Sequence, residues 1–496
     1  MRRLICMLVL SSFGAVDAAL AQEQKPAASQ RKDAVPPQML KLGPFDVSIN
    51  WRSRVELWDW FEGPSGNNDY AFFNSLLRAG VGQSKRRLNW RVEVSQPTVL
   101  TLPDDAVAAA PLGQLGLGGT YYAANSSRTN TGSLFLKQAF VQFNRLGRST
   151  LKVGRFEFFD GTEAKLPDPT VATLVQGRVA HRLISNFGFT VAQRSYDGAQ
   201  FSWDDGANNV TGFAARPTAG VFQVDGMKEL NVGIYYGAYN RAVRTDHGAG
   251  SFRAFVVGYV DRRTSVLKTD NRPAPVRATD HESIALATYG LNYVHVFDAE
   301  AAGKFDVVGW AVTQVGSWGT LMQRAGAFVG EVGWQPRAAL KPWLRAGYSY
   351  GSGDGNPQDA RNGTFFQLLT TPRQYARFPF YNMMNNEDVY GLFALRPSPK
   401  LTLRSELHAL WLANPSDLWY SGGGPFQPNT FGYAGRPSSG RTSLASVWDV
   451  GADTQLTPNV VLSLYYGHAA GRDVIRGIYP NAPGGNFGYV ESTVRF

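Results

Sequence analysis

Strict alternation of apolar and polar residues is the feature that most constrains how this chain can fold. Between Phe45 and Leu57 every odd position except Ser53 is apolar, and every even position is polar. The same period of two recurs in 88–95 and in 401–411. Because successive side chains of a β-strand point to opposite sides, this pattern predicts strands with one apolar and one polar face.

Segments of this kind recur along almost the whole chain, and the alternation is weakest in 133–145, 283–297 and 321–335. No stretch after residue 20 approaches the ~18 consecutive apolar residues that a membrane-spanning helix needs, so we expect an all-β chain of about eighteen strands. The predicted strands are 45–61, 70–81, 87–96, 133–145, 149–159, 187–204, 208–216, 228–240, 251–262, 283–297, 304–316, 321–335, 340–351, 387–397, 400–413, 443–456, 459–469 and 486–496.

The connections between these strands alternate in length. Short turns, such as 82–86 and 398–399, alternate with links that are often long, namely 97–132, 160–186, 263–282, 352–386, 414–442 and 470–485. Short periplasmic turns at one end and long extracellular loops at the other are typical of a transmembrane antiparallel β-barrel, which we therefore predict. Long loops are usually functional or disordered, and we expect 97–132 and 352–386 to fold over or into the mouth and restrict passage.

Both ends of the sequence carry export and assembly signals. A basic start with Arg2 and Arg3, an apolar stretch over 4–15 and the cleavage pattern Ala19-Leu20-Ala21 predict a secretory signal peptide over 1–21. Residues 22–44 are then a periplasmic lead-in and 45–496 the barrel. The last residue, Phe496, ends an alternating segment that resembles the signal read by the barrel-assembly machinery. We expect a monomer in the lipid of the bacterial outer membrane.

The polar face of such a barrel lines its lumen, and here it is rich in arginine. The chain has a formal charge of +10, and rings of arginine are a known device for anion selectivity. Guanidinium groups in a confined pore attract carboxylates with little screening. The alternation places seven arginines inward: Arg52, Arg54, Arg78, Arg91, Arg155, Arg345 and Arg404. It also places acidic residues there: Glu56, Glu93, Glu157, Glu406, Asp449, Asp453 and Glu491. Each arginine is therefore equally a candidate for a structural ion pair.

Several motifs, in order, resemble the alginate export family of outer-membrane porins. They are Leu-Lys-Val-Gly-Arg at 151–155, Arg-Ser-Tyr-Asp-Gly-Ala at 194–199, Gly-Tyr-Ser-Tyr-Gly-Ser-Gly-Asp at 347–354, Gly-Thr-Phe-Phe-Gln-Leu at 363–368 and the following Pro372. The resemblance implies an eighteen-stranded monomeric barrel that passes anionic polysaccharide through an arginine-lined constriction. By motif it carries over only Arg155 and Arg194 as residues of the substrate pathway. Phe156 departs from the family pattern, which has glutamine there.

Other functions fit these residues less well. An enzyme needs a histidine beside a carboxylate or serine near the rim, and pairs such as Asp246-His247 lie in or beside loops, so we assign no catalytic residue. Asp354, Asn356 and Asp359 lack the full spacing of a calcium loop, and we assign no metal or cofactor. Export makes a nucleic-acid partner remote. The main alternative is a general or substrate-specific uptake porin for small anions or oligosaccharides.

Overall fold

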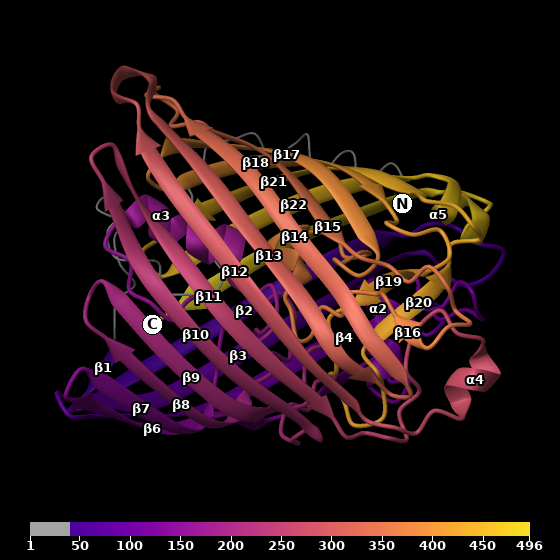
Figure 1. The fold of residues 1–496 in the computed structure, drawn as a ribbon, viewed down its shortest axis with the longest axis horizontal. Coiled ribbons are helices and arrows are strands. Elements are labelled where there is room, and N and C mark those ends of the chain that lie inside the picture. The colour runs from indigo at the N-terminus through magenta and orange to yellow at the C-terminus, as the bar shows by residue number, and fades with distance from the viewer. Residues whose placement is uncertain (1–39) are drawn as a thin grey trace.

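The computed structural model describes residues 40–496, with the side chain of Arg145 excepted. Eighteen long antiparallel strands form one sheet, and the last strand, β23, pairs with the first, β2, so that the sheet closes into a barrel (Figure 1). The predicted signal peptide and most of the predicted lead-in lie outside the described residues. Three short strands, β1, β5 and β16, pair at the margins of the barrel.

The long strands have the following bounds: β2 Phe45–Asp59, β3 Asp69–Ser84, β4 Leu88–Leu100, β6 Phe135–Leu146, β7 Ser149–Phe156, β8 Tyr196–Asp204, β9 Asn208–Pro217, β10 Val232–Thr245, β11 Gly248–Asp261, β12 Ile284–Asp298, β13 Lys304–Trp318, β14 Leu321–Gln335, β15 Trp343–Gly351, β17 Asn386–Ser398, β18 Leu401–Trp411, β21 Ser443–Gln455, β22 Val460–Gly471 and β23 Gly484–Arg495. The remaining elements are β1 Leu40–Leu42, β5 Thr131–Gly132, β16 Arg361–Asn362, the hairpin of β19 Leu418–Gly422 and β20 Tyr433–Pro437, and the helices α2 Gly116–Ala124, α3 Pro169–Leu174, α4 Ala274–Ala278 and α5 Asp473–Ile478, with the single turns η1 Val175–Val179, η2 Glu300–Ala302 and η3 Pro372–Gln374.

The predicted faces are realised in β2. Trp51 and Val55 are 50% and 42% exposed on the outer surface, whereas Arg52 and Arg54 between them are 8% and 4% exposed and point inward. The strand pairs with β23 on one side and β3 on the other without a register shift. A one-residue slip would turn every side chain to the opposite face, so the apolar and polar sets together fix this register.

All eighteen predicted strands are present. The end of β4 and both ends of β10 lie four or five residues later than expected, and the largest error is at the start of β8. The segment 187–204 was expected to be a single strand, whereas β8 begins only at Tyr196 and residues 187–195 lie inside the barrel. Leu40–Leu42, which belongs to the predicted lead-in, forms the short strand β1 and pairs with β2. Among residues 40–496, no helix has both the length and the apolar character to cross a bilayer.

The barrel interior is a packed core rather than an open tube. Two long connections fold into it, and we call 157–195 the first lumen loop and 352–385 the second lumen loop. Phe365, Phe366, Phe378 and Phe380 of the second loop are each at most 1% exposed. A third connection, 101–134, covers one end, where Tyr121 of α2 packs against rings of neighbouring elements (Figure 1). The expected folding of 97–132 and 352–386 over or into the mouth agrees with this arrangement.

The last residue extends the ladder that closes the barrel. The backbone of Phe496 exchanges two hydrogen bonds with Ile49 of β2, of 2.9 and 3.0 Å, and its side chain is 38% exposed. Deleting Phe496 removes these bonds and the terminal aromatic group. We predict a large loss of heat-modifiable barrel in the outer membrane, measured by electrophoresis with and without boiling. Phe297→Ala, which truncates another exposed ring, is the control. Assembly of the deleted chain at the yield of the unaltered chain would contradict the prediction.

Candidate functional site

The first lumen loop is fixed to the barrel wall by buried ion pairs. Its residue Glu157 contacts Arg78 of β3 at 3.0 Å and Lys137 of β6 at 3.1 Å. Farther along, Arg178 contacts Glu331 of β14 at 2.8 Å. Asp160 lies 3.4 Å from Arg253 of β11. The loop is thus held at well-separated points around the barrel, and it spans the lumen between them.

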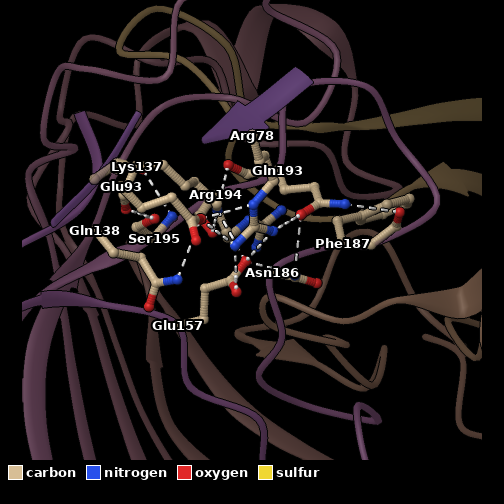
Figure 2. Close-up of polar contacts among 12 residues, drawn as sticks. Arg78, Glu93, Lys137, Gln138, Glu157, Asn186, Phe187, Gln193, Arg194 and Ser195 are labelled. Atoms are coloured by element: carbon tan, nitrogen blue, oxygen red, sulfur yellow. Dashed lines mark hydrogen bonds and ion pairs between the residues drawn. The ribbon is translucent and has the colours of Figure 1, made fainter. Parts of the chain in front are cut away.

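Figure 2 shows the attachment near β3, where Arg78, Glu157 and Gln193 converge. Arg78 donates hydrogen bonds to both Glu157 oxygens and to the Gln193 side-chain oxygen at 2.7 Å. Lys137, which is fully buried, donates to the carbonyls of Gln193 and Arg194. Burial opposes ionisation of Glu157, but the charges of Arg78 and Lys137 outweigh it and hold the pKa of Glu157 below its usual value. The carboxylate therefore stays ionised and keeps the loop in place.

A second charge cluster centres on Glu331 of β14. Three guanidinium groups surround its buried carboxylate: Arg178 at 2.8 Å, Arg345 at 3.0 Å and Arg182 at 3.7 Å. Asp306 of β13 shares Arg345 at 2.5 Å. Because two of the three arginines come from the first lumen loop, this cluster joins the loop to the wall far from Arg78.

The two lumen loops also contact each other. Ile184 and Leu369 form a parallel β-bridge, and the Ser185 amide donates to the Leu369 carbonyl at 2.9 Å. On the other side of the first loop, Arg52 of β2 donates to the carbonyls of Gly188 and Thr190 at 2.7 and 2.6 Å. The loops therefore form a connected partition across the barrel.

Six of the eight predicted pathway arginines lie on the inner face, and a carboxylate contacts each of them. The pairs are Arg52 with Glu491 (3.7 Å), Arg54 with Glu491 (2.6 Å), Arg78 with Glu93 (2.5 Å), Arg91 with Glu93, Arg345 with Asp306 (2.5 Å) and Arg404 with Asp453. The inward direction follows from the alternation as predicted. All six arginines form structural ion pairs, which the sequence analysis gave as their alternative role.

The expected inward direction of Arg155 is wrong. Arg155 lies on the same side of β7 as Val153, which is 45% exposed on the outer face. The next residue, Phe156, is fully buried and points to the inside. Arg155 instead makes a two-pronged pair with Asp197 of β8, which is its cross-strand partner. The acidic Glu157 does face the lumen, because β7 ends at Phe156 and the chain turns inward there.

Arg194 lies in the first lumen loop, not on a strand, and its side chain has no exposed surface. It donates to the Gly423 carbonyl at 2.9 Å, and burial lowers its pKa. A fully buried side chain does not line an open path in this structure, and the pathway role that the motif predicts for Arg194 stays a prediction.

One lumen arginine that the sequence analysis missed has a different environment. Arg377 of the second lumen loop is half-buried and donates to the Tyr489 hydroxyl at 3.3 Å, while the Arg54 guanidinium lies 4.7 Å from the centre of the same ring. Within residues 40–496, no carboxylate forms an ion pair with Arg377. Its position in 352–386, the loop expected to enter the mouth, was the available signal.

The candidate calcium residues hold their own loop together. Asp354 accepts from the Gly363 amide, Asn356 from the Gln358 amide and Asp359 from the Arg361 amide. In the described part of the chain, no three His, Cys, Asp or Glu side chains are grouped so as to hold a metal ion.

Comparison with known proteins identifies the family. The family model described as alginate export matches residues 117–477. The chain belongs to the alginate export family. Its fold is similar to that of two solved outer-membrane channels, OccK9 (OpdG) of Pseudomonas aeruginosa and OccAB2 of Acinetobacter baumannii. They are 10% and 9% identical, with TM-scores of 0.55 and 0.57, and the matches cover 91% and 92% of this chain and 98% and 99% of theirs. No curated protein matches the sequence significantly.

Family and fold together identify a porin-like channel of the bacterial outer membrane rather than an enzyme. The short turns therefore face the periplasm, and the long loops, including α2, β19 and β20, lie at the extracellular end.

The pair of Arg178 and Glu331 provides a test of the loop attachment. Removing one partner of a buried ion pair costs roughly 3–5 kcal/mol, so Arg178→Ala is expected to release part of the first lumen loop. We predict a higher and noisier single-channel conductance in planar bilayers. Arg337→Ala removes an exposed pair with Asp298 at a periplasmic turn and is expected to change nothing. A folded Arg178→Ala channel with unaltered conductance would show that this pair does not hold the loop.

Proposed function

We propose that this channel passes anionic solutes, with carboxylate-bearing polysaccharide of the alginate type as the first candidate. Membership of the alginate export family supports the polysaccharide. The formal charge of +10 and the lumen residue Arg377 support an anionic solute. On this proposal residues 1–21 direct export, Phe496 is read by the assembly machinery, and the barrel works as a monomer.

The observation that carries the proposal is Arg377, a lumen arginine that makes no direct ion pair with a carboxylate in residues 40–496. Burial opposes its charge, and the carboxylates of Glu406 and Asp449, which act on it only from a longer distance, help to raise its pKa. Arg377 lies beside Arg404: a methyl group added to Gly451 would meet Arg377 Nη1 at 3.4 Å and Arg404 Cγ at 3.6 Å. Asp453 pairs with Arg404, whereas in the described residues Arg377 donates to a tyrosine hydroxyl only. A half-buried guanidinium that no carboxylate contacts attracts a passing anion more strongly than a directly paired one does, because most of its five N–H groups remain available.

The uptake of small anions remains the second candidate, and the filled lumen favours it. The two lumen loops cross the barrel, and a wide polymer needs them to move. A small carboxylate needs only a local gap beside Arg377. The two candidates share the same attraction for anions and differ in the size of the solute.

Planar-bilayer recordings test the proposal. We predict an anion-preferring reversal potential in a salt gradient and block of the current by added polyuronate. One charge near the narrowest point changes the energy of a passing ion by roughly 1 kcal/mol, so Arg377→Glu is expected to move the reversal potential toward cations and to weaken the block.

The matched control is Arg155→Gln, which removes a guanidinium from the outer face and is expected to leave selectivity unaltered. An unselective or cation-preferring channel that ignores polyuronate would overturn the proposal. Anion preference with block by small carboxylates alone would favour the uptake candidate.

A further inference from the structure

The extracellular end of the barrel contains a cavity of about 380 Å³. It lies above the partition made by the lumen loops, and residues from six of the long connections and from the β2–β3 connection line it. Small-molecule sites usually measure roughly 300–1,000 Å³, so the cavity has the size of a binding site for one small solute.

The cavity wall is mainly apolar and contains seven aromatic residues, and neutral polar side chains such as Gln114, Ser421 and Thr430 make up a smaller part of it. Its rings include Trp60, Phe187, Phe222, Phe426, Phe431 and Tyr433. They come from four different connections, and several pack edge-to-face on one another, as Phe222 does on Phe426 at 5.3 Å. Among the described residues that line the cavity, none is acidic. Such a wall favours a flat apolar group over one that is covered with hydroxyls.

Two arginines, Arg373 and Arg436, interrupt this apolar wall, and both are only 5% exposed. Arg373 donates to the carbonyls of Ala376, Phe378 and Tyr381 at 2.5–2.8 Å. Burial lowers the pKa of Arg373 to about 10, so the group is still charged at neutral pH.

Arg436 has neutral partners as well. It donates to the carbonyls of Leu112 and Gln114 and to the Ser421 hydroxyl at 3.1–3.2 Å, and it lies 4.9 Å from the centre of the Trp419 ring. No carboxylate in residues 40–496 pairs with either arginine. Each guanidinium has five N–H groups, and these bonds use three of them.

A further polar group of the wall has no partner. Trp60 is 3% exposed, and its buried indole N–H makes no hydrogen bond within the described chain. The buried hydroxyl of Thr430 also has no hydrogen-bond partner there. Leaving a buried donor unpaired costs about 1–3 kcal/mol. A bound acceptor would remove this cost, so the donor is a second and independent indication of a ligand.

We propose that this cavity binds a small aromatic carboxylate. The ring packs among the aromatic side chains, and the carboxylate accepts hydrogen bonds from the free N–H groups of the wall and offsets part of the positive charge of Arg373 and Arg436. A uronate has the carboxylate but no aromatic ring to pack against Phe222, Phe426 and Phe431, so it binds less well. The site is independent of the selectivity proposed above, because binding here requires no passage through the lumen.

Equilibrium dialysis of labelled benzoate against the purified full-length protein in detergent tests this proposal. Benzoate is expected to bind above the background of empty micelles. Acetate, which has the charge without the ring, benzyl alcohol, which has the ring without the charge, and glucuronate are expected to compete at least about tenfold more weakly. Since these experiments use no ion current, an unselective channel would overturn the function above and leave this site standing.

Two variants locate the site. Arg436→Gln removes one charge, and Trp60→Phe keeps a ring but removes the unpaired N–H. Each variant loses one hydrogen bond to the charged carboxylate, and its affinity for benzoate is expected to fall about tenfold. Arg441→Gln, an exposed position in the same connection, is the control and is expected to bind normally. Heat-modifiable mobility verifies that each variant is folded. Absence of benzoate binding, equal binding by glucuronate, or full binding by both folded variants would overturn the proposal.

Discussion

The buried carboxylate of Glu331 and the guanidinium groups around it illustrate the constraint on which this structure depends. A barrel whose lumen is closed by its own loops buries many charges, and a buried charge is stable only when it is paired or hydrogen-bonded. Here the lumen loops supply the partners: Arg178 for Glu331, and Glu157 for Arg78 and Lys137. The same pairs therefore neutralise the wall and fix the loops.

This pairing limits what the arginine-rich lumen can do in transport. Six arginines that the alternation directs inward are each in contact with a carboxylate, so the formal charge of +10 overstates the field that a solute meets. Several arginines on loops inside the barrel or at its outer end have only neutral hydrogen-bond partners among the described residues. They include Arg194 and Arg377 in the lumen, and Arg373 and Arg436 around the outer cavity. Specificity in this channel is thus expected to come from loops rather than from strands.

The sequence was sufficient to predict the barrel, but it was not sufficient to predict which contacts fill the interior of the barrel. Alternation in a strand such as β2 locates both faces, because lipid contacts one and polar groups the other. It weakens where the inner face meets a loop instead of water, as at Tyr259 of β11 and Trp318 of β13, whose rings pack against Phe366 at 5.2 and 5.1 Å. Arg155 was misplaced because it was grouped with Glu157 by its charge, although it shares the outer side of β7 with Val153 and Glu157 lies beyond the end of the strand. Pairings between a loop and a strand 150 residues away, such as Arg178 with Glu331, leave no local pattern in the sequence.

The central claim is that the two lumen loops meet inside the barrel, and a disulfide trap tests it most directly. The side chains of Ser185 and Thr371 are in hydrogen-bond contact, and Cys6 is the one cysteine of the chain. The account predicts that Ser185→Cys and Thr371→Cys, combined, form a disulfide in the assembled protein, while each single cysteine resists a membrane-impermeant thiol reagent. Free, readily labelled cysteines in a folded barrel would place the loops outside the lumen and contradict the account.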